Sequence, residues 1–379
     1  MRVVHIGQEH SEDDIRIVRK ECATLISEGI EAIYITQQKE KRYSGEKICG
    51  VSVYTYEPYK MKIDIPILTW RLNRFFSRRR AMKLAISLNA SVFHIHEVEL
   101  YQIARYLKKR GKKLIFDQHE DSPGQRYQIE FERYHSSSFA KASSRIANYQ
   151  EKSMVRNSDL VIAASEMIAQ NIKNYQIKKN IVVIHNYAHN EATRCNMDDY
   201  LERERIICYA GGLFERRGIK YVVDSMYKVN GFFEFAGKLD TMMQKVYESS
   251  AGWKNCRYLG CLSRDEVNRL YERSRIGIIN NLDLPYHRNS NPNKLFEYMA
   301  AGLPIICTSI PAWAEIVNDA GCGLVVNATN EEEISDAINY LLDNPKKAQN
   351  MGQKGYAAFI NKYNWDVEKG KLIKAYRNL

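Results

Sequence analysis

The sequence lacks several features that would mark particular classes of protein. Among its 379 residues no apolar run approaches the roughly 18 residues that a membrane-spanning helix needs. The start, MRVVHIGQEHSEDD, has neither the cationic head nor the long apolar core of a signal peptide. The eight cysteines form no C-x-x-C pair, so we expect neither a zinc site nor a disulfide framework, and a reducing cytoplasm fits. The first predicted strand is not followed by G-x-G-x-x-G, which argues against a dinucleotide-dependent oxidoreductase.

Positive charge, in contrast, is in excess. The formal net charge is +11, and residues 57–145 carry 18 Lys and Arg against 9 Asp and Glu, so most of the excess lies in the first half. A basic surface predicts an anionic partner: phospholipid, a pyrophosphate-linked substrate or nucleic acid. The length predicts about two domains, each large enough for its own core.

Apolar strands alternate with amphipathic helices along the chain. Short apolar runs predict strands at 3–6, 32–36, 92–95 and 113–116, with helices between them, and hence an α/β fold built on parallel sheets. Residues 122–147 show no strong period and are predicted to include a mobile loop. The polar run at 191–204 breaks the alternation. We therefore expect a first domain at 1–195, a second at 196–362, and a closing helix within 363–379.

The stretch 276–308, IGIINNLDLPYHRNSNPNKLFEYMAAGLPIICT, is the most legible part of the second domain. Two apolar runs enclose a polar loop and a helix, which is a β-loop-α-β unit. Asn291 is predicted to cap the helix and Pro292 to take its first position, where no N–H is needed. Its apolar face begins at Leu295, and Gly302 is predicted to help end it.

The polar side of this helix predicts a binding site. Asn293, Lys294 and Glu297 are spaced by three and four residues and share a face. A helix N-terminus at the carboxyl end of a parallel strand binds anions, whereas a carboxylate one turn further suits a diol. The pattern is therefore typical of a nucleoside diphosphate site, with Glu297 on the ribose. A surface helix with solvated Lys294 and Glu297 explains the same residues equally well.

Basic side chains also follow the first strand of the second domain. Gly211 and Gly212 allow the backbone to come close to a ligand, and Arg216 and Arg217 lie in the same turn. Two guanidinium groups at the end of a strand suit a diphosphate that must leave with its charge neutralised. Lys238 is expected at the same edge, after the strand in FFEFAGKLD.

The run PNKLFEYMAAGLP resembles the donor-binding helix of glycosyltransferase family 4, and less specific similarities cover nearly the whole chain. The resemblance implies a GT-B fold, in which two Rossmann-like domains face a cleft and the last helix crosses back to the first domain. It implies that Glu297 holds the ribose, and it places Asn289, instead of the usual glutamate, at the donor sugar. Further residues lie at positions that match the turns and the donor helix of the family, and the resemblance implies that they also contact the donor: Gly7, Gly212, Arg217, Asn291, Leu295, Tyr258, Leu259 and Gly260.

The turn FDQHED resembles the family's turn after the corresponding strand, which makes His119 the first catalytic candidate. Glu120 and Asp121 are candidates for the base that takes the acceptor's proton. Histidines and carboxylates in the turns after 92–95 and 113–116 also suggest a metal site. We expect His94 and His96 to point to opposite faces of their strand, however, so a metal site is the less favoured interpretation.

The segment 61–90 interleaves aromatic residues with arginines at positions 71, 74, 78, 79 and 80. We expect the rings to pack in the core, and Arg71, Arg74, Arg78, Arg79 and Arg80 to meet an anionic membrane or acceptor surface. No nucleic-acid module signature is present, so nucleic acid is not the expected partner.

Taken with the chemistry of these turns, the resemblance implies a metal-independent, retaining glycosyltransferase. It would move a sugar from a nucleotide-diphosphate sugar to a saccharide acceptor, such as a polyprenyl-diphosphate saccharide in surface polysaccharide or lipopolysaccharide assembly. No cofactor is expected, and the enzyme would be cytoplasmic and peripheral at the inner face of the membrane. Two alternatives remain: a nucleotide-sugar 2-epimerase of the same fold, or a non-enzymatic basic module that binds nucleic acid.

Overall fold

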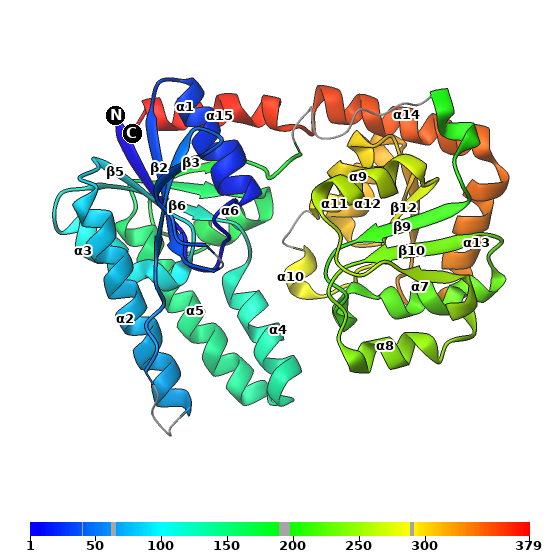
Figure 1. Ribbon diagram of the computed structural model, residues 1–379, viewed down its shortest axis with the longest axis horizontal. Coiled ribbons are helices and arrows are strands. Elements are labelled where there is room, and N and C mark those ends of the chain that lie inside the picture. The colour runs from blue at the N-terminus through cyan, green and yellow to red at the C-terminus, as the bar shows by residue number, and fades with distance from the viewer. Residues whose placement is uncertain (40, 62–65, 189–197, 289–291) are drawn as a thin grey trace. The chain divides into compact units, whose positions relative to one another are not determined.

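A computed structural model describes residues 1–39, 41–61, 66–188, 198–288 and 292–379; the side chains of 66–68, 70, 71, 198 and 286 also lie outside the description. The chain forms two compact units, each with its own parallel sheet (Figure 1). Unit 1 comprises Met1–Asn186 and Glu368–Leu379, and unit 2 comprises Tyr187–Val367. The last helix, α15 (Trp365–Arg377), therefore starts in unit 2 and returns the chain to unit 1.

The sheet of unit 1 has eight strands in the order β3-β4-β2-β1-β5-β6-β7-β8. Only the β3–β4 pair is antiparallel, so the predicted parallel sheet is confirmed. All four predicted strands form, as β1, β2, β5 and β6. The strands are β1 (Arg2–Ile6), β2 (Glu31–Gln37), β3 (Ser44–Ile48), β4 (Val51–Tyr56), β5 (Val92–Ile95), β6 (Lys113–Gln118), β7 (Leu160–Ala163) and β8 (Asn180–Val183).

The first connection of unit 1 starts as a π-helix. Asp14 accepts a hydrogen bond from the amide of Ile17 and so caps it, and its wider turn puts residues five apart on one face. Arg16 and Glu21, which have this spacing, are both buried. The helical elements of unit 1 are η1 (Ile15–Cys22), α1 (Ala23–Ser27), α2 (Pro66–Ser87), η2 (Val98–Leu100), α3 (Tyr101–Lys108), α4 (Ser122–Tyr134), α5 (Ser137–Asn157) and α6 (Glu166–Lys173).

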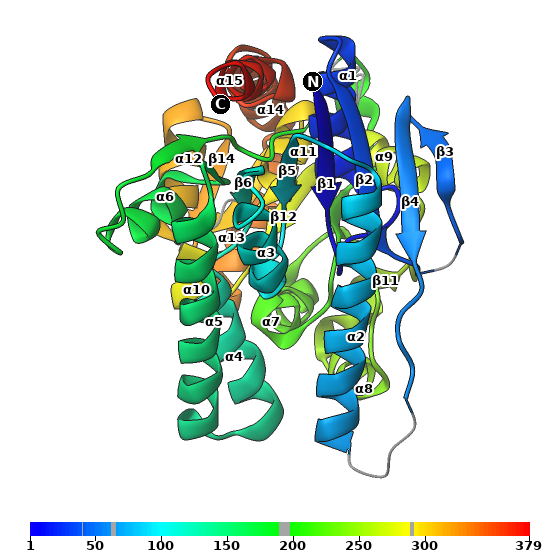
Figure 2. The ribbon, with the colours of Figure 1, turned by 90° about the vertical axis from the view of Figure 1, so that its left-hand side faces the viewer.

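The prediction of a mobile loop within 122–147 is wrong, because this segment forms α4 and the first half of α5. The two helices make a hairpin that extends away from the sheet beside α2 (Figures 1 and 2). No residue of α4 is buried, and Ile129 and Phe131 are exposed. A helix that packs so little of its surface needs no apolar stripe, which is why the period was missing from the sequence.

The sheet of unit 2 has six parallel strands in the order β11-β10-β9-β12-β13-β14. Ile207 and Tyr209 of β9 lie in one apolar cluster, and Ile206 and Cys208 in another. Because strand side chains alternate, both faces of this sheet are covered. The strands are β9 (Ile206–Ala210), β10 (Phe232–Ala236), β11 (Cys256–Tyr258), β12 (Ile276–Ile279), β13 (Ile305–Thr308) and β14 (Gly323–Val326).

The predicted donor helix forms as α11, but it begins one residue later than expected. Pro292 has extended backbone and occupies the N-cap position, and the helix begins at Asn293. Asn291, the predicted cap, lies outside the described residues. The other helical elements of unit 2 are η3 (Asp198–Glu202), η4 (Glu215–Arg217), α7 (Ile219–Ser225), η5 (Met226–Lys228), α8 (Thr241–Glu248), η6 (Ala251–Asn255), α9 (Arg264–Arg273), α10 (Pro285–Arg288), α11 (Asn293–Ala300), α12 (Pro311–Ala320), α13 (Glu331–Asp343) and α14 (Pro345–Asn361).

Among the described helices, none combines the length and the apolar character that crossing a membrane requires.

Candidate functional site

Glycine turns follow three neighbouring strands of unit 2. Gly211 comes after β9, Gly237 after β10 and Gly260 after β11, and all three have positive φ. The amide of Gly237 donates to the carbonyl of Gly260 at 2.7 Å, and that of Gly211 donates to Ala236 at 2.8 Å. A Cβ on Gly237 would lie 1.8 Å from the carbonyl oxygen of Gly211. There is therefore no room for a side chain at Gly237, and the three glycines leave bare backbone at this edge of the sheet.

Lys294 lies directly on the first of these turns. A Cβ at Gly211 would lie 2.3 Å from the Lys294 Nζ, and that ammonium is 5.1 Å from the centre of the Tyr209 ring. Burial lowers the pKa of Lys294 to about 8; Glu297 opposes this shift and the Arg217 guanidinium adds to it. The local environment thus disfavours the charged form of Lys294, and a bound anion would stabilise that form.

Arg217 is a second cation at this edge that an anion would stabilise. Its Nε is buried and has no hydrogen-bond partner among the described residues. Beside it, Arg216 stacks over the Phe214 ring at 4.4 Å. Burial lowers the pKa of the buried His287 to about 4; a hydrogen bond to the Leu282 carbonyl opposes this shift, and Arg217 and Arg216 contribute to it. A buried donor without a partner costs free energy, so the turn after β9 is suited to accept an anion.

Glu297 is already held by two side chains that sequence reasoning missed. Arg264 donates to its Oε1 at 3.0 Å, and the Tyr271 hydroxyl donates to its Oε2 at 3.1 Å. A carboxylate has about four acceptor positions, so about two remain. Both partners belong to α9, far from Glu297 in sequence, and no local spacing could have revealed them.

The remaining predicted donor residues occupy varied positions. Asn293 and Lys238 are exposed, whereas Leu295 is fully buried in the core, so its side chain packs there. The Tyr258 hydroxyl donates to the Gly237 carbonyl at 2.8 Å and so ties two of the glycine turns together, with Leu259 between Tyr258 and Gly260. A Cβ at Gly212 would lie 2.6 Å from the Phe214 ring. Asn289 and Asn291 lie outside the described residues.

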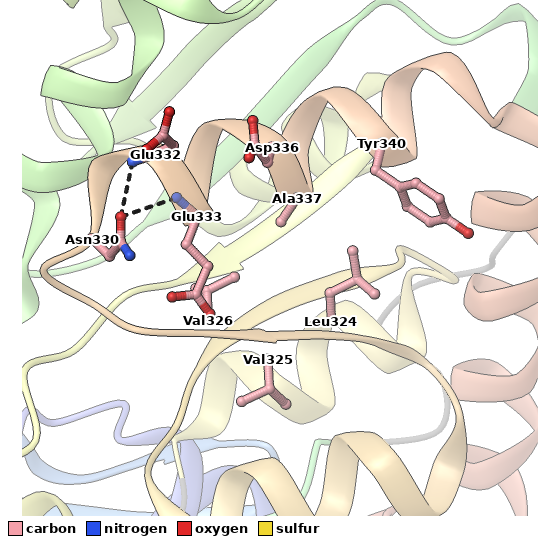
Figure 3. A pocket seen from close by; sticks show the side chains of 9 residues that line it. All are labelled: Leu324, Val325, Val326, Asn330, Glu332, Glu333, Asp336, Ala337 and Tyr340. Carbon is pink, nitrogen blue, oxygen red and sulfur yellow. Dashed lines mark hydrogen bonds between the residues drawn. The ribbon is translucent and has the colours of Figure 1, made fainter.

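A hollow elsewhere in unit 2 has the opposite charge to these turns. It lies between β14 and α13 and has a volume of about 610 Å³. Glu332, Glu333 and Asp336 line it, and Asn330 caps the helix beside it (Figure 3). Carboxylates repel a diphosphate, so this hollow is not suited to a nucleotide.

In unit 1, His119 lies at the carboxyl end of β6 and is held by a buried carboxylate. Its Nε2 is 2.8 Å from Asp117 Oδ2, and Arg16 donates two hydrogen bonds to Asp117, at 3.0 and 2.8 Å. Burial alone would raise the pKa of Asp117, but Arg16 and His119 hold it well below its ordinary value. Asp117 is therefore ionised, and an ionised carboxylate can only accept hydrogen bonds.

The other predicted catalytic residues of unit 1 have local partners. Asp121 accepts a hydrogen bond from the amide of Gly124 at 3.1 Å and so caps α4, while Glu120 is exposed and pairs with Gln125. The amides of Gln8 and Glu9, in the Gly7 turn, both donate to Glu97 Oε1, at 2.8 and 3.0 Å. The chain's own carboxylate therefore satisfies the Gly7 turn, which leaves these two amides unavailable to a phosphate.

The prediction that His94 and His96 face apart is wrong. Their rings stack with centroids 4.5 Å apart, because residues two apart on a strand point to the same face. His5 of β1 joins them, with its ring centroid 4.4 Å from that of His94. Potential metal-binding atoms of His5, Glu21, His94 and His96 lie within 4.8 Å of one another, as do those of His96, Asp117 and His119. The Arg16 guanidinium also lies 3.0 Å from Glu21, so a cation already occupies this charge environment.

The predicted basic surface is partly built into a groove. Arg74 and Arg78 of α2 line a cavity of about 630 Å³ together with residues of the α4–α5 hairpin. Arg79 and Arg80 are exposed, and the side chain of Arg71 lies outside the description. The expectation that the rings pack in the core fails for Phe75, which is 43% exposed. The hairpin contributes Arg126, Glu130, Arg133, Tyr134, Phe139, Ala142, Ser143, Ile146, Ala147 and Gln150, and Glu99 completes the lining.

Two family models match the chain, one for each half. Residues 16–188 match glycosyltransferase family 4, and residues 199–358 match glycosyl transferases group 1. An uncharacterized glycosyltransferase of Methanocaldococcus jannaschii is 24% identical over 234 residues, which are 61% of this chain and 63% of that relative. The chain thus matches less than two thirds of that relative. An MMP alpha-(1->4)-mannosyltransferase of Mycolicibacterium hassiacum is 26% identical over 116 residues, covering 30% of this chain and 27% of that one.

Solved structures show the same fold. Sucrose-phosphate synthase from Thermosynechococcus elongatus aligns over 100% of this chain and 98% of its own, with a TM-score of 0.80 and 15% identity. Anabaena HepE in complex with UDP-glucose aligns over 100% of both chains, with a TM-score of 0.74 and 11% identity. The predicted GT-B fold is confirmed, and together the two family models cover most of the sequence. The chain therefore belongs to the glycosyltransferases, in the family 4 and group 1 class with the GT-B fold.

Proposed function

We propose that this protein is a retaining glycosyltransferase that binds a nucleoside diphosphate sugar in unit 2 and transfers the sugar to a saccharide acceptor. One observation carries the proposal. At the glycine turn after β9, Lys294 has a lowered pKa and Arg217 has a buried Nε without a partner among the described residues. Two cations of this kind beside bare backbone suit a diphosphate.

The same groups would assist departure of the nucleotide. When the bond between the sugar and the diphosphate breaks, negative charge grows on the leaving phosphate. Lys294, Arg216 and Arg217 would stabilise this charge, so the basic side chains do work that a metal ion does in other enzymes. Glu297 keeps about two acceptor positions, which fit the two hydroxyls of a ribose. UDP-glucose is the first donor to test, because the similar HepE structure was determined with it.

Isothermal titration calorimetry with UDP, GDP, dTDP and CMP tests the donor site. We expect one of the diphosphates to bind, with and without chelator, and Lys294→Met to weaken binding about 10- to 100-fold, as loss of a charged hydrogen bond does. Lys228→Met is the control, since this exposed lysine pairs with Glu332 on the surface of the same unit. Equal binding by the wild type and Lys294→Met would contradict the proposed donor site.

A turnover assay then tests the reaction itself. Incubation of the bound donor with saccharide acceptors should release the nucleoside diphosphate and form a product with the same anomeric configuration. Release of a new free nucleotide sugar in the absence of acceptor would instead identify a 2-epimerase.

We further propose that the acceptor is lipid-linked, as in surface polysaccharide assembly at the inner face of a membrane. The groove beside α2 combines four arginines with apolar side chains, and Glu99 pairs with Arg126. Outside it, Phe75 and Arg79 are exposed next to each other, with the guanidinium 5.4 Å from the ring centre. A polyprenyl-diphosphate saccharide offers the matching chemistry of a diphosphate and a long apolar chain.

Sedimentation with vesicles tests the lipid proposal. We expect the protein to prefer vesicles that contain anionic phospholipid over neutral ones, and Arg79→Gln together with Arg80→Gln to reduce this preference. Lys346→Gln together with Lys347→Gln, at two adjacent exposed lysines of unit 2, provides a charge-matched control. An equal response to neutral and anionic vesicles would remove the membrane proposal and leave the donor site intact.

A further inference from the structure

A network of buried polar side chains in unit 1 lies behind the turn that carries His119. Gln118, the last residue of β6, donates from Nε2 to the carbonyl oxygen of Glu120 at 2.7 Å and to Glu151 Oε2 at 2.7 Å. Tyr175, which follows α6, donates from its hydroxyl to Glu151 Oε1 at 2.7 Å. Gln118 and Glu151 are 2% and 3% exposed. The network therefore joins the turn to α5 and to the end of α6.

The two acceptors fix which way the amide of Gln118 faces. A backbone carbonyl only accepts, and Glu151 accepts as well, so the two hydrogens on Nε2 match the two oxygens. The bond to the Glu120 carbonyl spans His119 and closes a small ring that contains the His119 backbone. Asp117, which points to the opposite face of β6, lies 2.8 Å from His119 Nε2. The turn is thus held from both faces of the strand.

Apolar packing contributes little to the position of this turn. The helix that follows it, α4, buries none of its residues, and the hydroxyl of Ser122 at its start lies 3.1 Å from Gln118 Nε2. A cavity of about 280 Å³ lies against the network, and only Pro123 and Ile168 among its lining residues are apolar. On these two sides, hydrogen bonds therefore define where the turn lies.

The network tolerates either protonation state of its carboxylate. Burial raises the pKa of Glu151 to about 7, against the hydrogen bonds from Tyr175 and Gln118; the other charged groups that face it are Asp121 and Lys152. When Glu151 is ionised, each of its oxygens accepts one hydrogen bond. When it is protonated, the Tyr175 hydroxyl can accept the new hydrogen, and the other oxygen still accepts from Gln118. The contact with Gln118 thus persists through neutral pH.

We propose that Glu151 is a positioning residue of this glycosyltransferase, which acts through Gln118 to hold the turn of residues 119–122 and with it His119. Tyr175 in turn holds Glu151 in place. The catalytic meaning of this assignment rests on the proposed function, because it requires that unit 1 presents the turn to the reacting sugars. The hydrogen bonds of the network can be tested without that function.

NMR of the ¹⁵N-labelled protein tests the network in the absence of substrate. We expect the side-chain amide hydrogens of Gln118, which are buried and bonded, to exchange with solvent on the order of 100-fold more slowly than those of Gln170, which is exposed on α6. Gln118→Leu assigns the signals. Glu151→Leu should remove this protection. Rapid exchange in the wild type would overturn the proposal, whether or not the variants fold.

Glu151→Gln is the conservative variant. Its amide oxygen can accept from Gln118, and its amide nitrogen can donate to the Tyr175 oxygen. We therefore expect it to retain the slow exchange that Glu151→Leu loses. Loss of protection in Glu151→Gln would mean that the charge of Glu151, and not its hydrogen bond to Gln118, holds the turn.

Turnover gives the second measurement, with the donor and acceptor that the transfer assay identifies. We expect Glu151→Leu to lower kcat about 10- to 100-fold, as misplacement of a group at a reaction site by about 1 Å does. The donor KM should stay nearly unchanged, because the proposed donor site is in unit 2. Glu151→Gln should have a kcat near that of the wild type, and an equal loss in both variants would overturn the proposal.

Met154→Ala is the matched control for stability. Met154 is fully buried on the same helix, α5, and packs in the apolar core of unit 1. Its truncation should lower the stability of unit 1 and leave kcat near the wild-type level well below the unfolding temperature. An equal loss of kcat in Met154→Ala and Glu151→Leu would show that Glu151 is merely structural. Absence of transfer in the wild type would count against the proposed function, and the exchange measurement would still decide the network.

Discussion

The carboxyl edges of the two sheets differ in how their charges are satisfied. In unit 1, Arg16 neutralises Asp117, Glu97 accepts from the Gly7 turn, and Asp121 caps a helix. In unit 2, Arg217 keeps a buried Nε without a described partner, and Lys294 is held where its charge is disfavoured. These carboxylates of the first edge thus have partners from the chain itself, whereas the second edge holds cations that a bound anion would satisfy. The comparison teaches that charges paired within the chain differ visibly from charges suited to bind a ligand: the first have partners close by, whereas the second include a buried donor without a described partner.

The largest effect is expected from removing the buried cation of the first edge. Arg16→Leu would leave the buried, ionised Asp117 without its cation, and we expect it to lower the free energy of unfolding by about 3–5 kcal/mol. Urea denaturation measures this loss. Arg19→Leu is the control, because its exposed ion pair with Asp13 should be worth at most about 1 kcal/mol. Similar losses in both variants would show that the buried network is not what stabilises unit 1.

At the carboxyl edge of the unit 2 sheet, a substitution should instead lower the rate of catalysis. We expect Arg217→Gln to lower turnover about 10²- to 10³-fold, as loss of one group that stabilises transition-state charge does, with little loss of stability. Steady-state kinetics and thermal unfolding separate the two effects. Arg257→Gln, which removes one of the two arginines that pair with the buried Glu234 and leaves Arg273 in place, should leave turnover near the wild-type level. If Arg217→Gln were much less stable than the wild type, Arg217 would contribute to folding as Arg16 does, and the two edges would not differ in this respect.

The ribose contact should be worth less. We expect the wild type to bind the preferred ribonucleoside diphosphate about tenfold more tightly than its 2′-deoxy form, since a hydrogen bond to a charged group is worth about 1.5–3 kcal/mol. Glu297→Gln should lose most of this preference when measured by calorimetry. Arg264→Met, which removes a partner of Glu297 and not the carboxylate, should retain it. A preference that survives in Glu297→Gln would place the ribose elsewhere.

The smallest effect is expected from pH. Lys294 has a pKa of about 8 without ligand, and a bound diphosphate should raise it, so binding takes up a proton once the free site has lost one. Affinity should therefore be constant below pH 8 and fall as the pH rises above it, by up to about tenfold per unit. Lys294→Met should show no such slope. Titrations between pH 7 and 8.5, over which the affinity should fall about fourfold, measure it, and a flat wild-type profile would mean that Lys294 does not meet the anion.

Much of the fold was predictable because its signals are local. The strands at 3–6 and 92–95 are short apolar runs, and the Ser165 cap of α6 can be read from adjacent residues. The α4–α5 hairpin was missed for the same reason, since α4 buries none of its residues and its sequence carries no apolar stripe. The start of α11 shifted by one residue, because proline tolerates both the cap and the first turn.

The candidate site was predictable only in part. Lys294 and Glu297 could be placed on one face from their spacing. The partners that hold Glu297, however, come from another helix, and Arg16 meets Asp117 across 101 positions of the chain. The pairing of His94 with His96 was within reach of the period of a strand, and our expectation there was simply wrong.

The sequence by itself determined which residues form strands and helices and which types of side chain end up at the edges of the sheets, because periodicity and capping act over a few positions. Only the tertiary structure decided which of those side chains satisfy one another. Hydrogen bonds and ion pairs join atoms that are close in space, and in a parallel sheet the neighbours of a strand end are usually remote in the chain.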